Sequence, residues 1–146
     1  MPALKTAKTT FRKQPAPSYV AAHSVAVSMP IADIARFLQD NLGQRLTARM
    51  AGISDAKQVG RWASGSSNPR PEAETRLRDA IQIFHLIQSA ESVYTARAWM
   101  IGMNPQLEDM APALCIADDR ARDVMVAARA YVEATDRTRA VAPTGA

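Results

Sequence analysis

The sequence predicts an all-α protein, and two features of its composition support that prediction. Of the 146 residues, 47% are apolar, and 28 of these apolar residues are alanine. Alanine is the best helix former and is depleted in strands, so a core of this composition requires helices that approach one another closely. Glycine is scarce, at six residues, and no stretch alternates apolar and polar residues over the length of a strand. An all-β fold is therefore excluded.

The two ends of the chain are predicted to lie outside the folded part. Residues 1–28 show no sustained apolar periodicity, contain Pro15 and Pro17, and carry four basic residues and no acidic one. Chain ends of this composition are poorly ordered unless something holds them. We therefore predict a disordered basic tail over residues 1–28 and a flexible tail over residues 135–146.

Residues 29–70 are predicted to form a helix-turn-helix domain. A first helix follows Pro30, because apolar residues recur there at helical spacing, and Gly43 is placed to end it. Residues 44–51 form a second short helix, after which Gly52 supplies a left-handed turn. Asp55 and Gln58 have the spacing of a capping box at the start of a third helix, which ends at Gly65. The residues expected to face inward are Ile31, Ile34, Phe37, Leu38, Leu42, Leu46, Met50, Val59 and Trp62.

The outward face of the helix before Gly65 is the candidate DNA-reading surface. A helix in the major groove presents its outward side chains to base edges, and arginine and glutamine can bind bases in bidentate fashion. Nearby arginines are placed to contact phosphates. The alternative is that this face is the solvated side of a structural helix. The turn after Gly52 is one residue longer than usual, so either it bulges or the next helix starts late. The predicted DNA-binding residues are Arg45, Arg49, Lys57, Gln58, Arg61, Ser64 and Arg70.

Residues 71–134 are predicted to form a smaller helical interaction domain. Pro71 suits the first position of a long helix, with Glu72 and Glu74 in its first turn. Further helices are expected at about 92–101 and 119–134, with a short segment at 112–117 between them, and Asp118 and Asp119 are expected to cap the last helix. The residues expected to be buried in the long helix and the last helix are Ala73, Leu77, Ile81, Phe84, Ile87, Ala121, Val124, Ala128, Tyr131 and Val132.

Charge is distributed unevenly along the chain. Residues 1–70 carry ten basic and three acidic residues, whereas residues 71–146 carry eight basic and eleven acidic residues. A basic first half joined to an acidic second half is typical of a chain with one half facing nucleic acid. A cationic tail on a neutral globule would give a similar balance.

Several function classes lack support in the sequence. It contains no glycine-rich phosphate loop, no nucleophile elbow and no metal-ligand cluster, so we expect no catalytic activity, metal or cofactor. Cys115, the single cysteine, and His85 are interpreted as core residues. No apolar run is long enough to cross a membrane, and the first residues lack the apolar core of a secretory signal. We therefore expect a cytoplasmic protein.

Residues 96–112 form a second candidate binding region. They place a tryptophan and three methionines around an Asn-Pro turn, and methionine-rich apolar surfaces adapt readily to partners. The alternative is an ordinary helix–turn core. The predicted partner-binding residues are Arg97, Trp99, Met103, Asn104, Pro105, Leu107, Met110 and Pro112.

These residues carry a resemblance to a known family. The segment GRWASG at residues 60–65, RLRDA at residues 76–80 and RAWMIGMNPQLEDMAP at residues 97–112 together resemble the Xre/MbcA/ParS-like antitoxin family. The resemblance covers residues 31–133. It is most specific over Arg97-Ala98-Trp99, Asn104-Pro105, Leu107 and Pro112. Two positions depart from the family pattern, because Glu108 stands where glycine is common and Ala111 where serine or threonine is common.

The resemblance implies a dimeric antitoxin of a toxin–antitoxin system. Its first half would bind operator DNA and repress its own operon, with Arg61 and its neighbours reading the DNA. Its second half would neutralise a RES-domain toxin, an enzyme that consumes NAD⁺, through the surface from Trp99 to Pro112 with the final helix and tail. Two alternatives remain open: a stand-alone transcription regulator whose second domain only dimerises it, and an interaction adaptor that does not bind DNA.

Overall fold

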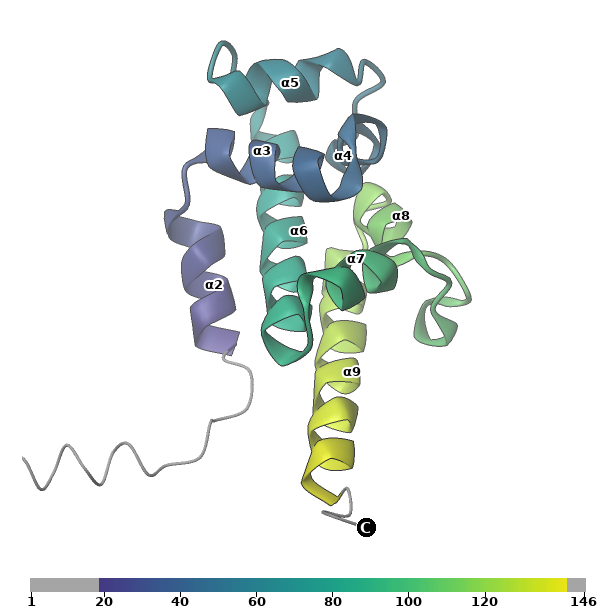
Figure 1. Ribbon diagram of the computed structural model, residues 1–146. Helices are drawn as coiled ribbons and strands as arrows, with labels where there is room; N and C mark the ends of the chain where they lie inside the picture. Colours follow the sequence, from purple (N-terminus) through teal and green to yellow (C-terminus); the bar gives the residue numbers. More distant parts are fainter. Residues whose placement is uncertain (1–18, 142–146) are drawn as a thin grey trace, which may run out of the picture.

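The protein is all-helical over residues 19–141, the part that the computed structural model describes (Figure 1). The all-α prediction is confirmed. The only extended pairing in this range is an isolated bridge between Asn104 and Met110. The helices are α2 (Tyr19–Ser28), α3 (Ile31–Leu42), α4 (Gln44–Ala51), α5 (Lys57–Ser64), α6 (Pro71–Ala90), α7 (Val93–Ile101), the 3-10 turn η1 (Pro105–Leu107), α8 (Pro112–Ala117) and α9 (Ala121–Val141).

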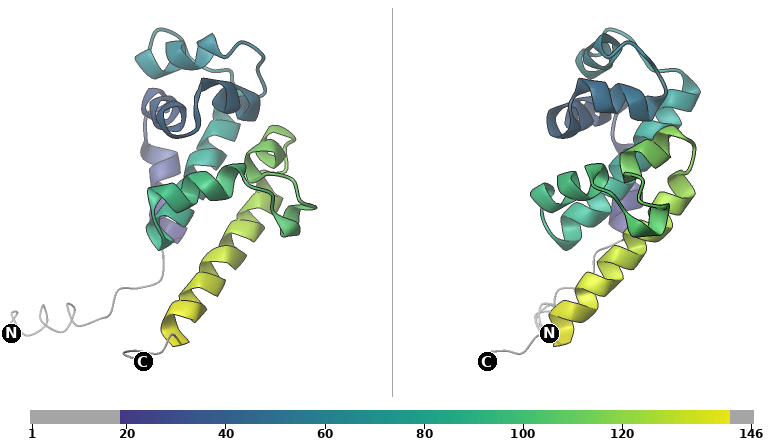
Figure 2. Two further views of the ribbon diagram at one scale, coloured as in Figure 1. Left: turned by 45° about the vertical axis from the view of Figure 1, so that its right-hand side comes forward. Right: turned by 90° about the vertical axis from the view of Figure 1, so that its right-hand side faces the viewer.

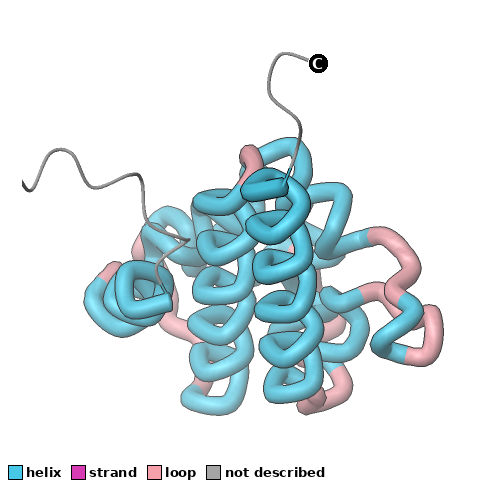
Figure 3. The backbone as a smooth tube through the Cα atoms, turned by 90° about the horizontal axis from the view of Figure 1, so that it is seen from below, coloured by secondary structure: helices cyan, strands magenta, loops and turns pink. Residues whose placement is uncertain are grey.

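α6 is the central helix of the fold. Helices α2, α3, α4, α7, α8 and α9 all pack against it, and α9 runs beside it over much of its length (Figure 3). Its predicted stripe is confirmed, because Ala73, Leu77, Ile81, Phe84 and Ile87 are all buried. The buried residues from both halves of the chain form one cluster. The predicted boundary at residue 70 therefore does not separate two cores.

The prediction of a disordered tail over residues 1–28 is wrong for its last ten residues. Those residues form α2, which packs on α6 through Ala22 and Ala26. At the other end of α2, Tyr19 donates a hydrogen bond to Glu133 of α9 over 3.3 Å, and the guanidinium of Arg129 lies 5.0 Å from the Tyr19 ring centre. Residues 1–18 lie outside the described part of the chain.

The last helix is longer than predicted and starts differently. α9 continues to Val141 rather than ending near residue 134, so the predicted flexible tail is wrong for residues 135–141, and residues 142–146 are outside the described range. Asp118 and Asp119 do not cap it. Asp118 ends α8, and the first backbone hydrogen bond of α9 runs from the Val124 amide to the Arg120 carbonyl.

Arginine side chains close the carboxyl ends of several helices, where backbone carbonyls lack partners within the helix. Arg36 bonds Ala63 of α5 at 2.8 Å. Arg76 bonds Ala51 of α4 at 3.0 Å, and Arg139 bonds Ala90 of α6 at 2.9 Å. Arg78 bonds Ala26 and Met29 at the end of α2, at 2.7 and 2.9 Å. None of the helices in residues 19–141 is long and apolar enough to span a membrane.

Candidate nucleic-acid interface and partner surface

α4 and α5 form a pair of short helices joined by a turn. α4 ends at Gly52, whose φ of 86° is left-handed and whose amide bonds Ala48 and Arg49. The predicted left-handed turn at this glycine is confirmed. Residues 52–56 separate the two helices, so α5 starts late, at Lys57. It lies across α3 at one end of the molecule, away from the free end of α9 (Figure 2).

The start of α5 only partly matches the predicted capping box. The Asp55 carboxylate accepts a hydrogen bond from the Lys57 amide at 3.0 Å, and the Gln58 amide bonds the Asp55 backbone carbonyl. The residue preceding the helix is Ala56, which makes no side-chain cap. The reciprocal bond from the Gln58 side chain is not made among the described residues. Asp55 therefore closes the turn without a capping box.

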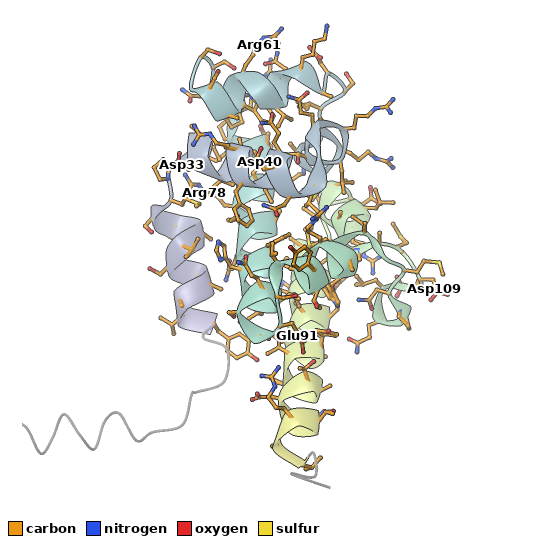
Figure 4. All side chains as sticks on the ribbon, viewed as in Figure 1. Asp33, Asp40, Arg61, Arg78, Glu91 and Asp109 are labelled. Atoms are coloured by element: carbon orange, nitrogen blue, oxygen red, sulfur yellow. The ribbon has the colours of Figure 1, made fainter. Side chains whose placement is uncertain are left out.

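α5 has one buried face and one exposed face. Val59, Trp62 and Ala63 are buried, as predicted for the first two, and α5 packs against α3 and α4. Lys57, Arg61 and Ser64 are exposed, and Arg61 points outward from the end of the molecule (Figure 4). Gln58 differs from the prediction, because it is half-buried and lines a cavity beside the turn.

The basic side chains around α5 differ in whether they make an ion pair or hydrogen bond within the described chain. Arg45, Arg49 and Arg70 are exposed, as is Lys57, and none of these side chains has an ion pair or hydrogen bond within residues 19–141. Arg61 lies 3.8 Å from Asp55, with both side chains about half exposed, and an ion pair so exposed contributes little stability. These cations are therefore available to an anionic ligand.

A second exposed surface lies on α7 and on the two residues that follow it, Gly102 and Met103. Tyr94, Ile101 and Met103 are 74%, 57% and 80% exposed, and Arg97 is exposed on the same helix. Met103 and Arg97 were among the predicted partner-binding residues. Tyr94 and Ile101 were missed, because α7 carries apolar residues on its buried and exposed sides alike.

Most of the other predicted partner-binding residues are buried or half-buried. Leu107 and Pro112 are buried, so a partner bound here would not contact them directly. Trp99 is half-buried, with its ring centre 6.3 Å from that of Tyr131 on α9. Asn104 accepts a hydrogen bond from the Gln106 amide at 2.9 Å and starts η1. Met110 is half-buried and Pro105 is exposed.

The loop after η1 adopts an unusual backbone conformation. Glu108 and Asp109 have φ values of 54° and 65°, in the left-handed region that glycine adopts most easily. Arg120 holds the loop, because it lies 2.9 Å from the Glu108 carboxylate and donates to the Met110 sulfur at 3.8 Å. A third contact of the same guanidinium, to Asp123 at 3.0 Å, joins the loop to α9.

Two hollows flank the first turns of α6. A cavity of about 470 Å³ lies between the α4–α5 turn and the start of α6. A groove of about 890 Å³ follows α6 and α9, and Asp79 lies in it with a pKa that burial raises. No cluster of three or more potential metal ligands occurs in residues 19–141. Cys115 is buried, as predicted, and burial raises the pKa of its thiol.

Comparison of the chain with protein-family models, curated proteins and solved structures gives no match. Its function therefore has to be inferred from its own residues.

Proposed function

We propose that this protein is a DNA-binding antitoxin that represses its own operon and neutralises a RES-domain toxin. The observation that carries the DNA-binding part is the exposed face of α5, flanked by cations that no other group of the described chain engages. The toxin-binding part depends on the resemblance at residues 97–112 together with the exposed apolar surface on α7. A stand-alone regulator is the alternative.

The geometry of α5 supports its role as the helix that enters the major groove. Its buried face is anchored on α3, so Lys57 and Arg61 extend from a rigid support at the end of the molecule. Arg61 is placed to bind a guanine edge, and the unengaged arginines beside it are placed to contact phosphates. Such units usually bind as dimers on two half-sites, so we propose a homodimer on cytoplasmic operator DNA.

The partner surface supports the antitoxin role in a different way. Tyr94, Ile101 and Met103 are large exposed apolar residues within one short stretch of α7 and the turn after it, and exposed apolar patches mark protein-binding sites. The left-handed backbone at Glu108 is the conformation that the family's glycine would adopt readily. The backbone at Glu108 therefore supports the resemblance at a position where the residue type differs from the family's.

DNA binding is tested first with a pool of random-sequence duplexes, from which the full chain selects its preferred site. We expect Arg61→Ala to weaken binding to that site by about 1–3 kcal/mol and to relax preference at one base pair. Arg122→Ala is the matched control, because Arg122 is exposed on α9 and has no partner in the described chain. Equal effects of the two variants would refute the assignment of α5.

Toxin binding is tested by co-expressing the tagged chain with a RES-domain protein encoded beside it, followed by size-exclusion chromatography. We expect Met103→Glu to break the complex, because it places a carboxylate at the most exposed apolar residue of this surface. Val27→Glu is the control, since Val27 is 63% exposed on α2, outside the surface expected to meet the toxin. A chain that elutes as a lone dimer with no bound neighbour would favour the stand-alone regulator.

A further inference from the structure

Arg76 joins two turns that are far apart in the sequence. From α6, its Nη1 donates to the carbonyl oxygen of Ala51, the last residue of α4, at 3.0 Å. Its Nε donates to the carboxylate of Asp119, between α8 and α9, also at 3.0 Å. One guanidinium thus contacts both the turn that leads into α5 and the turn that leads into α9.

The α4–α5 turn is shaped around this guanidinium. A Cβ atom built on Gly52 would lie 2.6 Å from Nη1 of Arg76, so the arginine fills the space that a side chain would need there. Arg76 also lines both the cavity beneath the turn and the groove along α6 and α9. Because hollows lie on both sides of it, the side chain has room to move when one of its two contacts is lost.

Asp119 is the exposed end of this connection. Its carboxylate is 73% exposed, whereas the Arg76 side chain is 21% exposed. An ion pair with one solvated partner contributes little to stability, but it fixes the orientation of a forked guanidinium. At the other end, Trp62 of α5 lines the same cavity as Gly52 and Arg76. Asp119 is therefore linked through Arg76 to the end of α4, and the cavity beside that link is lined by Trp62 of α5.

We propose that Arg76 is a positioning residue that couples Asp119 to the orientation of α5, so that the α8–α9 turn regulates DNA affinity without touching DNA. The functional consequence rests on the proposed DNA binding. The coupling itself does not, because Trp62 reports on the turn directly. An interaction at the exposed Asp119 carboxylate would change DNA affinity by releasing Arg76.

The test compares two aspartates in the same backbone conformation. Asp119 and Asp109 have φ values of 62° and 65°, so replacement of either by glycine relieves the same strain, and Asp119→Gly alone removes the contact to Arg76. Both changes are made in the full chain carrying Trp99→Phe, which leaves Trp62 as the one remaining tryptophan of two. The readouts are Trp62 emission and affinity for the selected duplex, with circular dichroism confirming that each variant is folded.

We expect Asp119→Gly to shift Trp62 emission to longer wavelength and to weaken DNA binding about three- to tenfold, whereas Asp109→Gly changes neither. Asp119→Asn keeps the acceptor oxygen and should retain both properties. Arg76→Lys should match Asp119→Gly with no added effect in the double variant, because an ammonium group cannot span both acceptors.

Identical emission and identical affinity for the two glycine variants would overturn the proposal. If no duplex is bound by the parent protein while Asp119→Gly still shifts the emission, the coupling through Arg76 is supported and the DNA-binding function is refuted. If Asp119→Gly weakens DNA binding but leaves Trp62 emission unchanged, the coupling from Arg76 through the α4–α5 turn is refuted.

Discussion

The guanidinium of Arg78 lies 2.7 Å from the carbonyl oxygen of Ala26 and 2.9 Å from that of Met29. These two contacts join α6 to the carboxyl end of α2, a helix whose own buried residues are only Ala22 and Ala26. The carboxylate of Glu74, one helical turn earlier in α6, lies 2.9 Å from Nε of Arg78. Arg78 is labelled at this junction in Figure 4. Arg78 therefore holds the carboxyl end of α2, as the Tyr19 contacts to α9 hold its other end.

Arg78→Met should weaken that attachment. The substitution retains a long apolar stem but leaves two carbonyls at the end of α2 without their charged donor, and a hydrogen bond to a charged group contributes about 1.5–3 kcal/mol. We expect a loss of about 2 kcal/mol in the free energy of unfolding, measured with urea, and faster proteolysis within residues 19–30. Arg122→Met, in an exposed arginine, should change neither, and equal losses would contradict this role for Arg78.

Gly52→Ala should cost more stability than Gly65→Ala. Both glycines end helices with left-handed φ values, 86° and 82°, so alanine introduces about 1–2 kcal/mol of backbone strain at each. Only at Gly52 would the new Cβ also push Nη1 of Arg76 away from the Ala51 carbonyl oxygen, since nothing lies within 4 Å of the corresponding position at Gly65. Thermal unfolding of the two variants measures the difference. Equal melting temperatures would show that Arg76 moves away from the new Cβ without loss of stability.

Asp79→Asn should stabilise the protein at neutral pH. Burial raises the pKa of Asp79 above its ordinary value near 3.8, so the folded state binds the proton more tightly than the unfolded state. Its contribution to stability is complete below pH 3.8 and is lost as the pH rises through the folded pKa. The gain from the asparagine should therefore be largest at pH 7 and should vanish in acid. Urea unfolding from pH 3 to pH 7 checks this, with the exposed Asp118→Asn as control.

His85 should give the protein an acid-sensitive step. Its ring is stacked on Phe37 with ring centres 5.4 Å apart, its Nε2 is buried with no hydrogen-bond partner among residues 19–141, and burial lowers its pKa below 6.5. The unfolded state therefore binds the proton more readily, and stability should fall as the pH drops below 6.5 toward the folded pKa. His85→Phe should flatten this fall while His23→Gln, on an exposed histidine, should not. A flat wild-type profile between pH 7 and pH 5 would exclude the effect.

Periodicity predicted the helices whose buried residues are large. The stripes of α3 and α6 recur at helical spacing. Ile34, Leu38 and the stripe of α6 are buried as expected, whereas Ile31, Phe37 and Leu42 of α3 are half-buried. α2 was missed because its buried face consists of alanine while Val20 and Val27, at 79% and 63% exposure, lie outside. In such a helix the apolar pattern in the sequence does not mark the buried side.

The candidate sites were predictable in outline but not in detail. The exposed face of α5 followed from the spacing of Val59 and Trp62. The partner surface did not follow in the same way, because a dense run of apolar residues around a turn does not show which of them face the core. Leu107 and Pro112 proved to be buried, and Tyr94 proved to be exposed. The last turns of α9 are polar, and Arg139 ties them to α6 through a contact that no local pattern indicates.

Arginines that hydrogen-bond the carboxyl ends of helices are not free to neutralise phosphates. They therefore reduce the number of counterions that the protein would release from DNA. Each phosphate that a cation neutralises releases condensed counterions, with a slope of about −0.9 in a plot of log affinity against log salt concentration. Arg36 is bonded to Ala63 and does not count toward that release. Four unengaged cations beside Arg61 remain in residues 31–70, namely Arg45, Arg49, Lys57 and Arg70. At about −0.9 each, these four would contribute a slope of about −3.6 per subunit to the proposed DNA binding, to which Arg36, held by a helix carbonyl, would add nothing.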